Sequence, residues 1–364
     1  MRLFLCGDVM TGRGIDQVLP RPGDPALHES WVHSALHYVD LAERRSGAIA
    51  KPVPFGYVWG DALAELDRRA PQLRIVNLET SITAAGTPEP KGINYRMHPG
   101  NVGCITAAGI DCCVLANNHL ADWGPTGIVD TLAVLDEAGI ATAGAGRDAT
   151  EAAAPAVLDA GTGTRTLVFA FGLPSSGVPA HWAASPGRPG VNFLPDIDER
   201  SVDRIAGDVA RWVQPGDLVV VSLHWGSNWG YDIPIVWRQF AHALVADAGV
   251  HVLHGHSSHH PRAVEVHRGR PIMYGCGDFI NDYEGIGGYE AFRGDLVLAY
   301  FLDLDDAEHT LQGFEAVPFQ LRRFRLQRAS AEQATWLSTC LDRQCRSLGA
   351  AVSLTGDGTL GLSW

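Results

Sequence analysis

Five short segments of this chain each end an apolar run with residues that bind metals or carry protons. Apolar runs of this length read as buried strands, and ligands collect outside the carboxyl ends of strands in an open α/β sheet. We therefore expect Asp, Glu, Asn and His side chains from five strand ends to converge on one rim. The segments are Cys6-Gly7-Asp8-Val9, Val76-Asn77-Leu78-Glu79, Ala116-Asn117-Asn118-His119, Ser222-Leu223-His224-Trp225 and Leu253-His254-Gly255-His256.

Two regions carry more than one candidate group. Asn118 and His119 place an amide oxygen beside an imidazole, so a metal ligand and a proton carrier could be neighbours. Asp122 follows three residues later, where it either caps the next helix or orients His119. The segment from His254 to His260 contains four imidazoles, a density that indicates metal binding or acid–base chemistry, and Asp278 adds a glycine-flanked carboxylate downstream.

The elements that must position these groups alternate between strand and helix over residues 1–260. This pattern predicts βαβ units and a sheet covered on both faces. Apolar spacing predicts helices over 126–138, 201–213 and 236–248, and central strands over 165–171 and 218–221. Gly139 ends the first of these helices in the manner of a C-cap.

The last third of the chain changes to strand-like segments, which predicts a second sheet packed against the first. These segments are 263–266, 271–274, 296–302 and 313–325. We treat residues 1–364 as a single domain, with 263–330 forming mainly the second sheet. Long loops inside a compact domain are usually functional or disordered, so 15–58, 84–100 and 173–196 are predicted to be insertions or lids.

Composition narrows the function classes. Apolar residues make up 46% of the 364 positions and charged residues 19%, which is ordinary for a globular protein with a large core. A net charge of −13 without a basic cluster argues against a nucleic-acid partner, because neutralising phosphates needs a basic face. We expect no membrane partner, because no apolar run reaches the roughly 18 residues of a span.

Cysteine usage and the start of the chain bear on the compartment. The seven cysteines are an odd number and lie mostly in apolar runs, which favours buried thiols over a disulfide framework. A strand that begins at Arg2 leaves no room for a signal peptide. We therefore expect a cytoplasmic protein, and the sequence leaves its oligomeric state open.

These motifs resemble the CapA family of capsule and poly-γ-glutamate type proteins, which has a calcineurin-like metallophosphoesterase fold. The resemblance implies an α/β fold, a four-layer α/β/β/α sandwich of two packed mixed sheets. It implies metal ligation by Asp8, Glu79, Asn118, His224 and His256. The matching residues, over roughly 1–300, are Gly7-Asp8-Val9-Met10, Asn77-Leu78-Glu79, Asn117-Asn118-His119 with Asp122 and Gly124, His224-Trp225-Gly226, Gly255-His256 with His259, and Tyr274-Gly275 with Gly277-Asp278-Phe279.

The chain departs from the metallophosphoesterase pattern at two ligands. Those enzymes carry Asp-x-His at the first strand, where this chain has Asp8-Val9-Met10, and a bridging Asp where this chain has Glu79. Loss of an imidazole disfavours a tightly held two-metal centre. We therefore expect a divalent ion with mainly oxygen ligands, Ca²⁺ foremost, with Mg²⁺, Mn²⁺ or Zn²⁺ as alternatives.

A CapA-like chain of this kind is also similar to the peptide epimerases of lasso-peptide biosynthesis, which act on a C-terminal tryptophan. Inverting a Cα centre needs a base on one face and an acid on the other, and nearby positive charge to stabilise the carbanion. The predicted pairs are His119 with Asp122, and a histidine of 256–260 with Asp278 or Asp8. The catalytic set is thus His119, Asp122, His256, His260 and Asp278.

Large aromatic residues near the motifs could form an indole-sized pocket for a peptide substrate, although such residues are core residues as often. The predicted substrate-binding residues are Trp123, Trp225, Trp229 and Arg96, with Trp59 as a further wall. The preferred function is a metal-dependent epimerase of a ribosomal peptide. A metallophosphoesterase or amide hydrolase is the first alternative, and a non-catalytic protein of poly-γ-glutamate or capsule assembly is the second.

Overall fold

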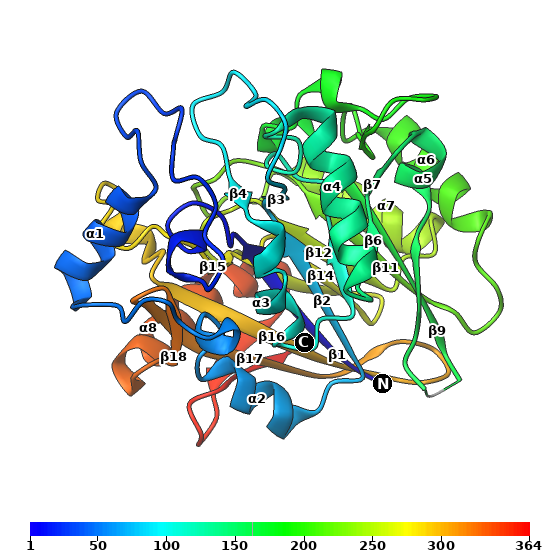
Figure 1. Ribbon diagram of the computed structural model, residues 1–364. Helices are drawn as coiled ribbons and strands as arrows, with labels where there is room; N and C mark the ends of the chain where they lie inside the picture. Colours follow the sequence, from blue (N-terminus) through cyan, green and yellow to red (C-terminus); the bar gives the residue numbers. More distant parts are fainter. Residues whose placement is uncertain (162) are drawn as a thin grey trace.

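The computed structural model describes residues 1–161 and 163–364. Within these residues the strands form a larger sheet of ten strands, a smaller sheet of six and two short pairs (Figure 1). Both large sheets are mixed, so the predicted α/β class with mixed sheets is confirmed. The larger sheet contains β1 (Arg2–Val9), β2 (Leu73–Leu78), β5 (Cys112–Val114), β6 (Ala141–Ala143), β15 (Asp278–Ile280), β16 (Leu296–Leu304), β17 (Leu311–Arg322), β18 (Arg325–Arg328), β19 (Ala351–Leu354) and β20 (Leu360–Ser363).

The smaller sheet and the short pairs complete the strands. The smaller sheet contains β8 (Ala156–Asp159), β9 (Arg165–Gly172), β11 (Leu218–His224), β12 (Val252–His256), β13 (Val264–His267) and β14 (Arg270–Met273). The short pairs are β3 (Ser81–Ile82) with β4 (Arg96–Met97), and β7 (Ala145–Gly146) with β10 (Gly190–Val191). The helices are α1 (Leu36–Ser46), α2 (Ala62–Arg69), α3 (Gly103–Thr106), α4 (Gly124–Glu137), α5 (Ala149–Ala153), α6 (Glu199–Ala210), α7 (Ile235–Asp247) and α8 (Ala331–Cys345).

Strand β1 organises the larger sheet because it lies between parallel and antiparallel neighbours. It runs parallel to β2 and antiparallel to β16, so that Leu5 lies opposite Ile75 on one side and Tyr300 on the other. Parallel strands buried on both faces are continuous apolar runs, and residues 3–6 of β1 are completely buried. The site residues at the end of β1 are therefore held by a rigid central strand.

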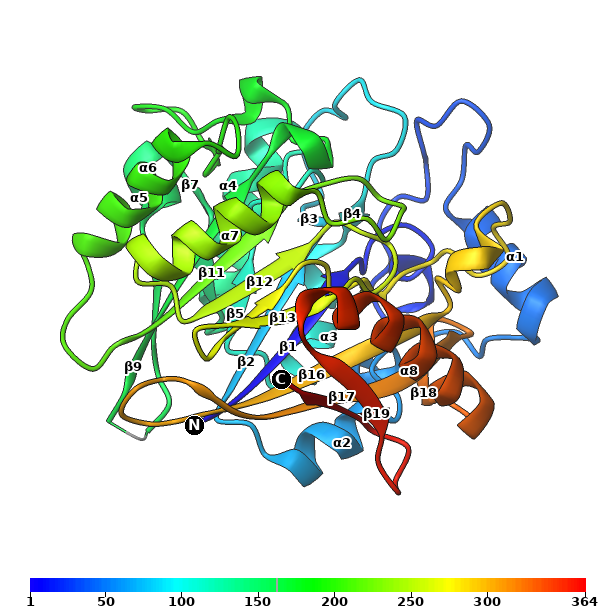
Figure 2. The same ribbon diagram turned by 180° about the vertical axis from the view of Figure 1, so that it is seen from behind.

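Side-chain alternation along β1 separates two core layers. Leu3 and Leu5 pack between the two large sheets, together with Val220 of the smaller sheet. Phe4 and Cys6 point to the opposite face, where residues of α2, α3 and α4 cover the sheet (Figure 1). Figure 2 shows α7 crossing the outer face of the smaller sheet, where α6 and α7 share its core.

The predicted helices and central strands are found close to their expected bounds. Residues 126–138, 201–213 and 236–248 correspond to α4, α6 and α7, and residues 165–171 and 218–221 lie in β9 and β11. Gly139 has a φ of 73°, the left-handed conformation expected after a helix. The predicted insertion 15–58 contains α1, which its sequence did not indicate.

The division of strands between the sheets differs from the prediction. Residues 263–330 do not form the second sheet, because β13 and β14 extend the smaller sheet while β16, β17 and β18 belong to the larger one. The physical reason lies in β16, whose residues are almost all buried. A strand with two buried faces must lie inside a covered sheet, and β16 fills the place beside β1.

The cysteines agree with the expectation of buried thiols. All seven cysteines lie in the described residues as free thiols, and six of them are buried. Across residues 1–161 and 163–364, no helix combines the length and the apolar content that crossing a membrane requires.

Candidate metal and acid–base site

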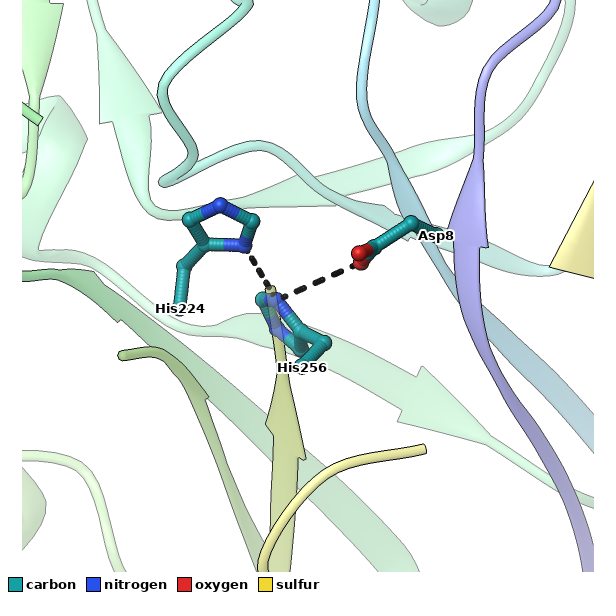
Figure 3. Close-up of side chains that lie close together, drawn as sticks. All are labelled: Asp8, His224 and His256. Atoms are coloured by element: carbon teal, nitrogen blue, oxygen red, sulfur yellow. Dashed lines mark hydrogen bonds and ion pairs between the residues drawn. The ribbon is translucent and has the colours of Figure 1, made fainter. Parts of the chain in front are cut away.

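Side chains from five strand ends meet at the rim shared by the two large sheets. Asp8 lies at the end of β1, Glu79 directly after β2 and His119 in the loop after β5, while His224 and His256 end β11 and β12. Glu79 Oε1 lies 3.8 Å from His119 Nε2 and 3.9 Å from His224 Nε2. Asp8 Oδ1 lies 3.9 Å from His256 Nδ1 (Figure 3). The structure thus brings these five predicted residues together.

A close backbone approach fixes the position of Asp8. The Asp8 amide donates a 2.9 Å hydrogen bond to the carbonyl of Gly277, and Asp8 lies opposite Asp278 in the parallel pair of β1 and β15. A Cβ atom on Gly7 would lie only 1.6 Å from the Gly277 oxygen, so no other residue fits there. Two buried carboxylates are consequently held near each other by backbone geometry.

The carboxylates of Asp8 and Glu79 are both buried, and no Lys or Arg among residues 1–161 and 163–364 forms an ion pair with either of them. Asn77 Nδ2 donates to Asp8 at 2.7 Å and lies 3.5 Å from Glu79. Burial, followed by the charge of Asp278, raises the pKa of Asp8 to about 7. Burial and the charge of Asp8 likewise raise the pKa of Glu79 well above its usual value. Both shifts report negative charge that a bound cation would stabilise.

A chain of hydrogen bonds sets the tautomer of His256. His254 Nε2 donates to the Cys6 carbonyl at 2.7 Å, which leaves its Nδ1 to accept from the Ser222 hydroxyl at 3.2 Å. Ser222 Oγ in turn accepts from His256 Nε2 at 2.7 Å. Burial lowers the pKa of His254 to about 4 and that of His256 well below its usual value, so both rings are neutral. The Nδ1 atom of His256 therefore carries a free lone pair.

His224 directs its Nδ1 atom toward the Nδ1 atom of His256. Its Nε2 donates to Asn118 Oδ1 at 2.9 Å, and burial lowers its pKa well below the usual value. The two Nδ1 atoms of His224 and His256 then face each other at 2.7 Å, as Figure 3 shows. Two lone pairs at this distance repel unless a proton or a cation lies between them.

The donor set fits a divalent cation. One ligand atom each from Asp8, His224 and His256 lie within 4.8 Å of one another, and all three side chains are buried. Neutral imidazoles, and carboxylates whose pKa values are raised by burial and then by neighbouring carboxylates, are typical of a metal site. The other two predicted ligands, Glu79 and Asn118, lie near the Nε2 atom of His224, away from the Nδ1 atom that faces His256.

His119 forms a buried pair with Asp122. Its Nδ1 donates to Asp122 Oδ2 at 2.6 Å, and its Nε2 faces Glu79. The Tyr95 amide and the Lys91 ammonium also donate to Asp122, at 2.6 and 2.7 Å, so the carboxylate cannot turn away. Burial lowers the pKa of His119 to about 4. A neutral imidazole with Nδ1 protonated keeps Nε2 free to accept a proton.

A second imidazole–carboxylate pair lies beside Asp8. His259 Nδ1 donates to Asp278 at 2.8 Å, and Asn281 donates to the other oxygen of that carboxylate at 2.7 Å. Burial acts to lower the pKa of His259, but the charge and hydrogen bond of Asp278 outweigh it and raise the pKa. Asp8, His259 and Asp278 also offer ligand atoms within 4.8 Å of one another.

His260, which the sequence placed among the catalytic residues, is packed among aromatic rings instead. Its ring lies 4.5 Å from that of Tyr231 and 4.7 Å from that of Phe292, and its Nδ1 contacts the Pro261 carbonyl. The sequence left open which histidine of 256–260 pairs with Asp278. His259 is the one whose ring is directed at the Asp278 carboxylate.

Two of the predicted substrate-binding aromatic residues are core residues. Trp225 is stacked between Trp237 and Tyr274, and its Nε1 donates to the Tyr274 carbonyl at 3.1 Å. Trp59 is completely buried and donates to the Cys104 carbonyl. The prediction that these two rings line a pocket was wrong, because an indole whose N–H bonds a backbone oxygen is fully accommodated by the core.

The other predicted substrate-binding residues lie nearer the acid–base pairs. Trp123 directly follows Asp122, and the guanidinium carbon of Arg96 lies 3.7 Å from the centroid of its ring. Trp229 is half-buried, with its ring 5.3 Å from that of His259 and stacked on the exposed Tyr289 at 4.0 Å. These residues flank the two imidazole–carboxylate pairs.

Sequence reasoning missed several residues that the structure places at the site. Ser222 and His254 were inside the quoted motifs, and the period of two in a strand could have placed them on the same face as His224 and His256. Their register in β11 and β12, Ser222 opposite His254, makes the hydrogen-bond chain possible. Lys91 is one of only two lysines in the chain and gave no signal beyond its place in a predicted lid.

Two of the predicted lids are linked to each other and to the acid–base pair. Glu89 accepts hydrogen bonds from His181 at 2.6 Å and from Trp182 at 3.2 Å, which joins residues 84–100 to residues 173–196. Two residues further on, Lys91 bonds the Asn118 carbonyl as well as Asp122. The two loops therefore cover the His119 side of the site.

A separate buried ion cluster lies close by. Arg13 donates to Asp282 at 3.1 and 2.5 Å and to Glu29 at 2.9 Å, and all three side chains are at most 1% exposed. The guanidinium also lies over the rings of Tyr38 and Tyr95, at 3.8 and 4.4 Å. This cluster contains its own cation and needs none from outside.

Comparison with known proteins places the chain in a family. It is 46% identical over 360 residues to the probable polyglutamine synthesis accessory protein of Mycobacterium tuberculosis, an alignment that covers 98% of this chain and 94% of the relative. It is 30% identical over 298 residues to the PGA biosynthesis protein CapA of Bacillus subtilis, covering 81% of this chain and 66% of that protein. The sequence profile described as bacterial capsule synthesis protein PGA_cap matches residues 2–283. The chain therefore belongs to the PGA_cap family of bacterial capsule synthesis proteins.

Proposed function

We propose that this protein is an accessory enzyme in the synthesis of a glutamate- or glutamine-containing polymer, and that it hydrolyses amide bonds of that polymer with the help of a divalent metal ion. The polymer class is supported by the names of the relatives, a polyglutamine synthesis accessory protein and a PGA biosynthesis protein. One observation carries the catalytic part. The neutral imidazole of His119, held by the Asp122 carboxylate, presents a free Nε2 to the side of the site where Glu79 and His224 meet.

The metal would be held by Asp8, His224 and His256, whose ligand atoms converge, with Glu79 and Asn118 close by on the Nε2 side of His224. A divalent ion there would polarise the amide carbonyl and lower the pKa of the attacking water. The two imidazole nitrogens found at 2.7 Å shift our expectation from Ca²⁺ toward Mn²⁺ or Zn²⁺, since imidazole ligands suit these ions better. The arrangement of two sheets between helices supports assigning the four-layer calcineurin-like metallophosphoesterase fold.

His119 is the proposed general base and then the general acid. It takes a proton from water as the water oxygen bonds to the amide carbon, and returns that proton to the nitrogen when the C–N bond breaks. Asp122 holds Nδ1 protonated and stabilises the imidazolium that forms. Lys91 and the Tyr95 amide keep this carboxylate in place throughout.

The direct test is a cleavage assay on polyglutamate and polyglutamine, with chelator-treated protein reloaded with Mn²⁺, Zn²⁺, Mg²⁺ or Ca²⁺. We expect shorter chains by mass spectrometry, with one oxygen from H₂¹⁸O in each new carboxylate. Cleavage of phosphoesters but not of amides would favour the phosphoesterase alternative. Polymer binding without cleavage under every ion would favour a non-catalytic role in assembly.

A His119→Ala variant tests the acid–base assignment. General acid–base groups contribute about 10²- to 10⁴-fold to rates, so we expect a loss of this size in kcat with ion binding retained. His33→Ala, at an exposed histidine, is the matched control and should cleave normally. Equal rates for both variants would remove His119 from the mechanism.

A second candidate, peptide epimerisation, is favoured by one specific observation. Two imidazole–carboxylate pairs are present, His119–Asp122 beside Glu79 and His259–Asp278 beside Asp8, and inverting a Cα centre requires two such groups, a base and an acid. Incubating the protein with peptides in D₂O separates this function from hydrolysis. Incorporation of one deuterium at Cα without chain cleavage would support epimerisation, and unlabelled peptide would exclude it for the peptides tested.

A further inference from the structure

A small cavity lies beside the His119–Asp122 pair, between the segment 94–96 and the loop around residue 24. Its volume is about 10 Å³, close to the space of one water molecule. It is lined by Arg13, Gln17, Asp24, Ala26, Leu27, Ala35, Asn94, Arg96 and Trp123. Asn94 and Arg96 flank Tyr95, whose amide bonds Asp122, and Trp123 follows Asp122 directly. The cavity is thus built from the neighbours of the residues that hold His119.

The walls of this cavity offer hydrogen-bond donors. Trp123 is 6% exposed, yet its Nε1 has no hydrogen-bond partner among residues 1–161 and 163–364. The Arg96 guanidinium lies over the Trp123 ring and donates only one hydrogen bond to the described part of the protein, to the Asp24 carbonyl at 3.3 Å. A buried donor left without a partner costs free energy, so these groups favour a ligand that accepts hydrogen bonds.

One wall also offers an acceptor. Asn94 is 4% exposed, and its Nδ2 donates to the carbonyls of Glu89 at 3.1 Å and Asp122 at 3.3 Å. These two bonds fix the orientation of the amide, which leaves Oδ1 as an acceptor with no donor in the described residues. A ligand that satisfies the whole cavity must both accept and donate.

The charges around the cavity disfavour an anion. The positive charge of Arg13 is already neutralised by Asp282 and Glu29, which together carry one more negative charge than it supplies. Arg96 is balanced by the Asp24 carboxylate, which lines the same cavity. A carboxylate ligand would find no surplus of positive charge and would oppose the free Asn94 oxygen, whereas a neutral primary amide has both the acceptor and the donor that the walls require.

We propose that this cavity is a subsite for a primary carboxamide, the side chain of a glutamine residue in the substrate. The carboxamide oxygen accepts from Trp123 Nε1 and Arg96, and its NH₂ group donates to Asn94 Oδ1. A carboxamide is larger than the present cavity, so the exposed Ala26 must move outward to admit it, while Asp24 stays beside Arg96. This proposal rests on the proposed function and extends it, because it names glutamine rather than glutamate as the residue of the polymer that the subsite recognises.

The experiment measures binding without turnover. The full-length His119→Ala protein is titrated calorimetrically with end-blocked hexaglutamine and with end-blocked hexaglutamate. We expect hexaglutamine to bind at least tenfold more tightly. Trp123→Phe, which keeps a ring for Arg96 but removes the N–H, should reduce the preference about fivefold or more, and Arg96→Gln should reduce it further.

Matched controls separate this subsite from general effects. Trp212→Phe, at an exposed tryptophan far from the site in sequence, and Arg44→Gln, at an exposed arginine of α1, should leave the preference unchanged. Equal affinity for both peptides, or a preference for hexaglutamate, would overturn the proposal. An unchanged preference in Trp123→Phe and Arg96→Gln would also overturn it and leave the cavity as a place for one water. Because binding is measured in a protein without His119, failure of the cleavage assay does not affect this result.

Discussion

Two buried charge clusters lie side by side in this protein and solve the same problem differently. In the first, Arg13 neutralises Asp282 and Glu29 within the chain. In the second, Asp8 and Glu79 are equally buried, and a third carboxylate, Asp278, adds to their negative charge. Burying a charge is costly unless it is paired. The first cluster is therefore complete as folded, whereas the second becomes complete when a cation binds.

The pKa directions express the same difference. Burial alone would lower the pKa of Arg13, but the negative charge of Asp282 keeps it well above its usual value. In the second cluster the pKa of Asp8 rises to about 7 because burial and Asp278 both disfavour its charge. A buried carboxylate with a raised pKa beside free imidazole nitrogens is thus a sign of a ligand site, whereas a buried carboxylate on an arginine is a sign of a structural pair.

The largest effect is expected when the internal cation is removed. Arg13→Met would leave Asp282 and Glu29 buried without a partner, and breaking a buried pair in this way costs about 3–5 kcal/mol. Urea unfolding at pH 7 should show this loss, and added metal ions should not restore it. Arg44→Met, at an exposed arginine of α1, is the control. A loss below about 1 kcal/mol, smaller than the cost of an unpaired buried group, would show that the two clusters do not differ in this way.

The next effect is expected from adding the external cation. Saturating metal-free protein with Mn²⁺ or Zn²⁺ at 100 times its Kd should raise the free energy of unfolding by about 2.7 kcal/mol. His224→Ala and His256→Ala should abolish this gain, because they remove the two imidazole ligands. The same gain in wild type and variants would place the ion somewhere else.

A smaller effect follows from the raised pKa of Asp8. A raised pKa contributes stability that is complete below about pH 4, near the unfolded value, and is lost as the pH rises through about 7. Asp8→Asn removes that loss, so the metal-free variant should be more stable than wild type at pH 8. We expect a difference of about 2 kcal/mol in the free energy of unfolding, which is half of the free energy that corresponds to a pKa shift of about three units. At pH 4 the two proteins should unfold at nearly the same urea concentration. A variant that is less stable at pH 8 would contradict the proposal that the buried charge of Asp8 destabilises the metal-free protein.

The smallest effect concerns the tautomer of His256. Ser222→Ala breaks the hydrogen-bond chain from Cys6 through His254, so His256 is no longer held with Nδ1 free. Losing such an outer partner usually weakens metal binding 10- to 100-fold, and we expect about tenfold by competition with a chelator. Ser176→Ala, a buried serine that bonds the His224 carbonyl, controls for packing. Identical affinities in the two variants would mean that the tautomer is set by another group.

The convergence of Asp8, Glu79, His119, His224 and His256 could be predicted from the sequence because each follows an apolar run. Parallel strands bring such ends to one edge whatever their separation along the chain. The α4, α6 and α7 helices followed from apolar spacing in the same way. The relatives in capsule and polyglutamine synthesis agree with the predicted family and favour the assembly-related alternative over the epimerase prediction.

What the sequence did not reveal depends on contacts between elements. Nothing in residues 296–302 shows that they pair with β1 rather than with β14, since an apolar strand is suited to either sheet. Trp225 and Trp123 are each adjacent to a site residue, but only packing distinguishes the core ring from the ring beside the cavity. Lys91 reaches Asp122 from a loop without regular structure, and such a contact leaves no periodic signal.

The contact between Gly7 and Gly277 has a consequence for how this centre could be redesigned. Because the two backbones touch, the spacing of Asp8 and Asp278 is independent of the surrounding side chains. Positions 222, 224 and 256 belong to strands of the other sheet, whereas His254 bonds the Cys6 carbonyl of β1. A library confined to positions 222, 224 and 256 would therefore vary ion preference against a constant pair of acids, while a methyl group at Gly7 would force the two strands apart.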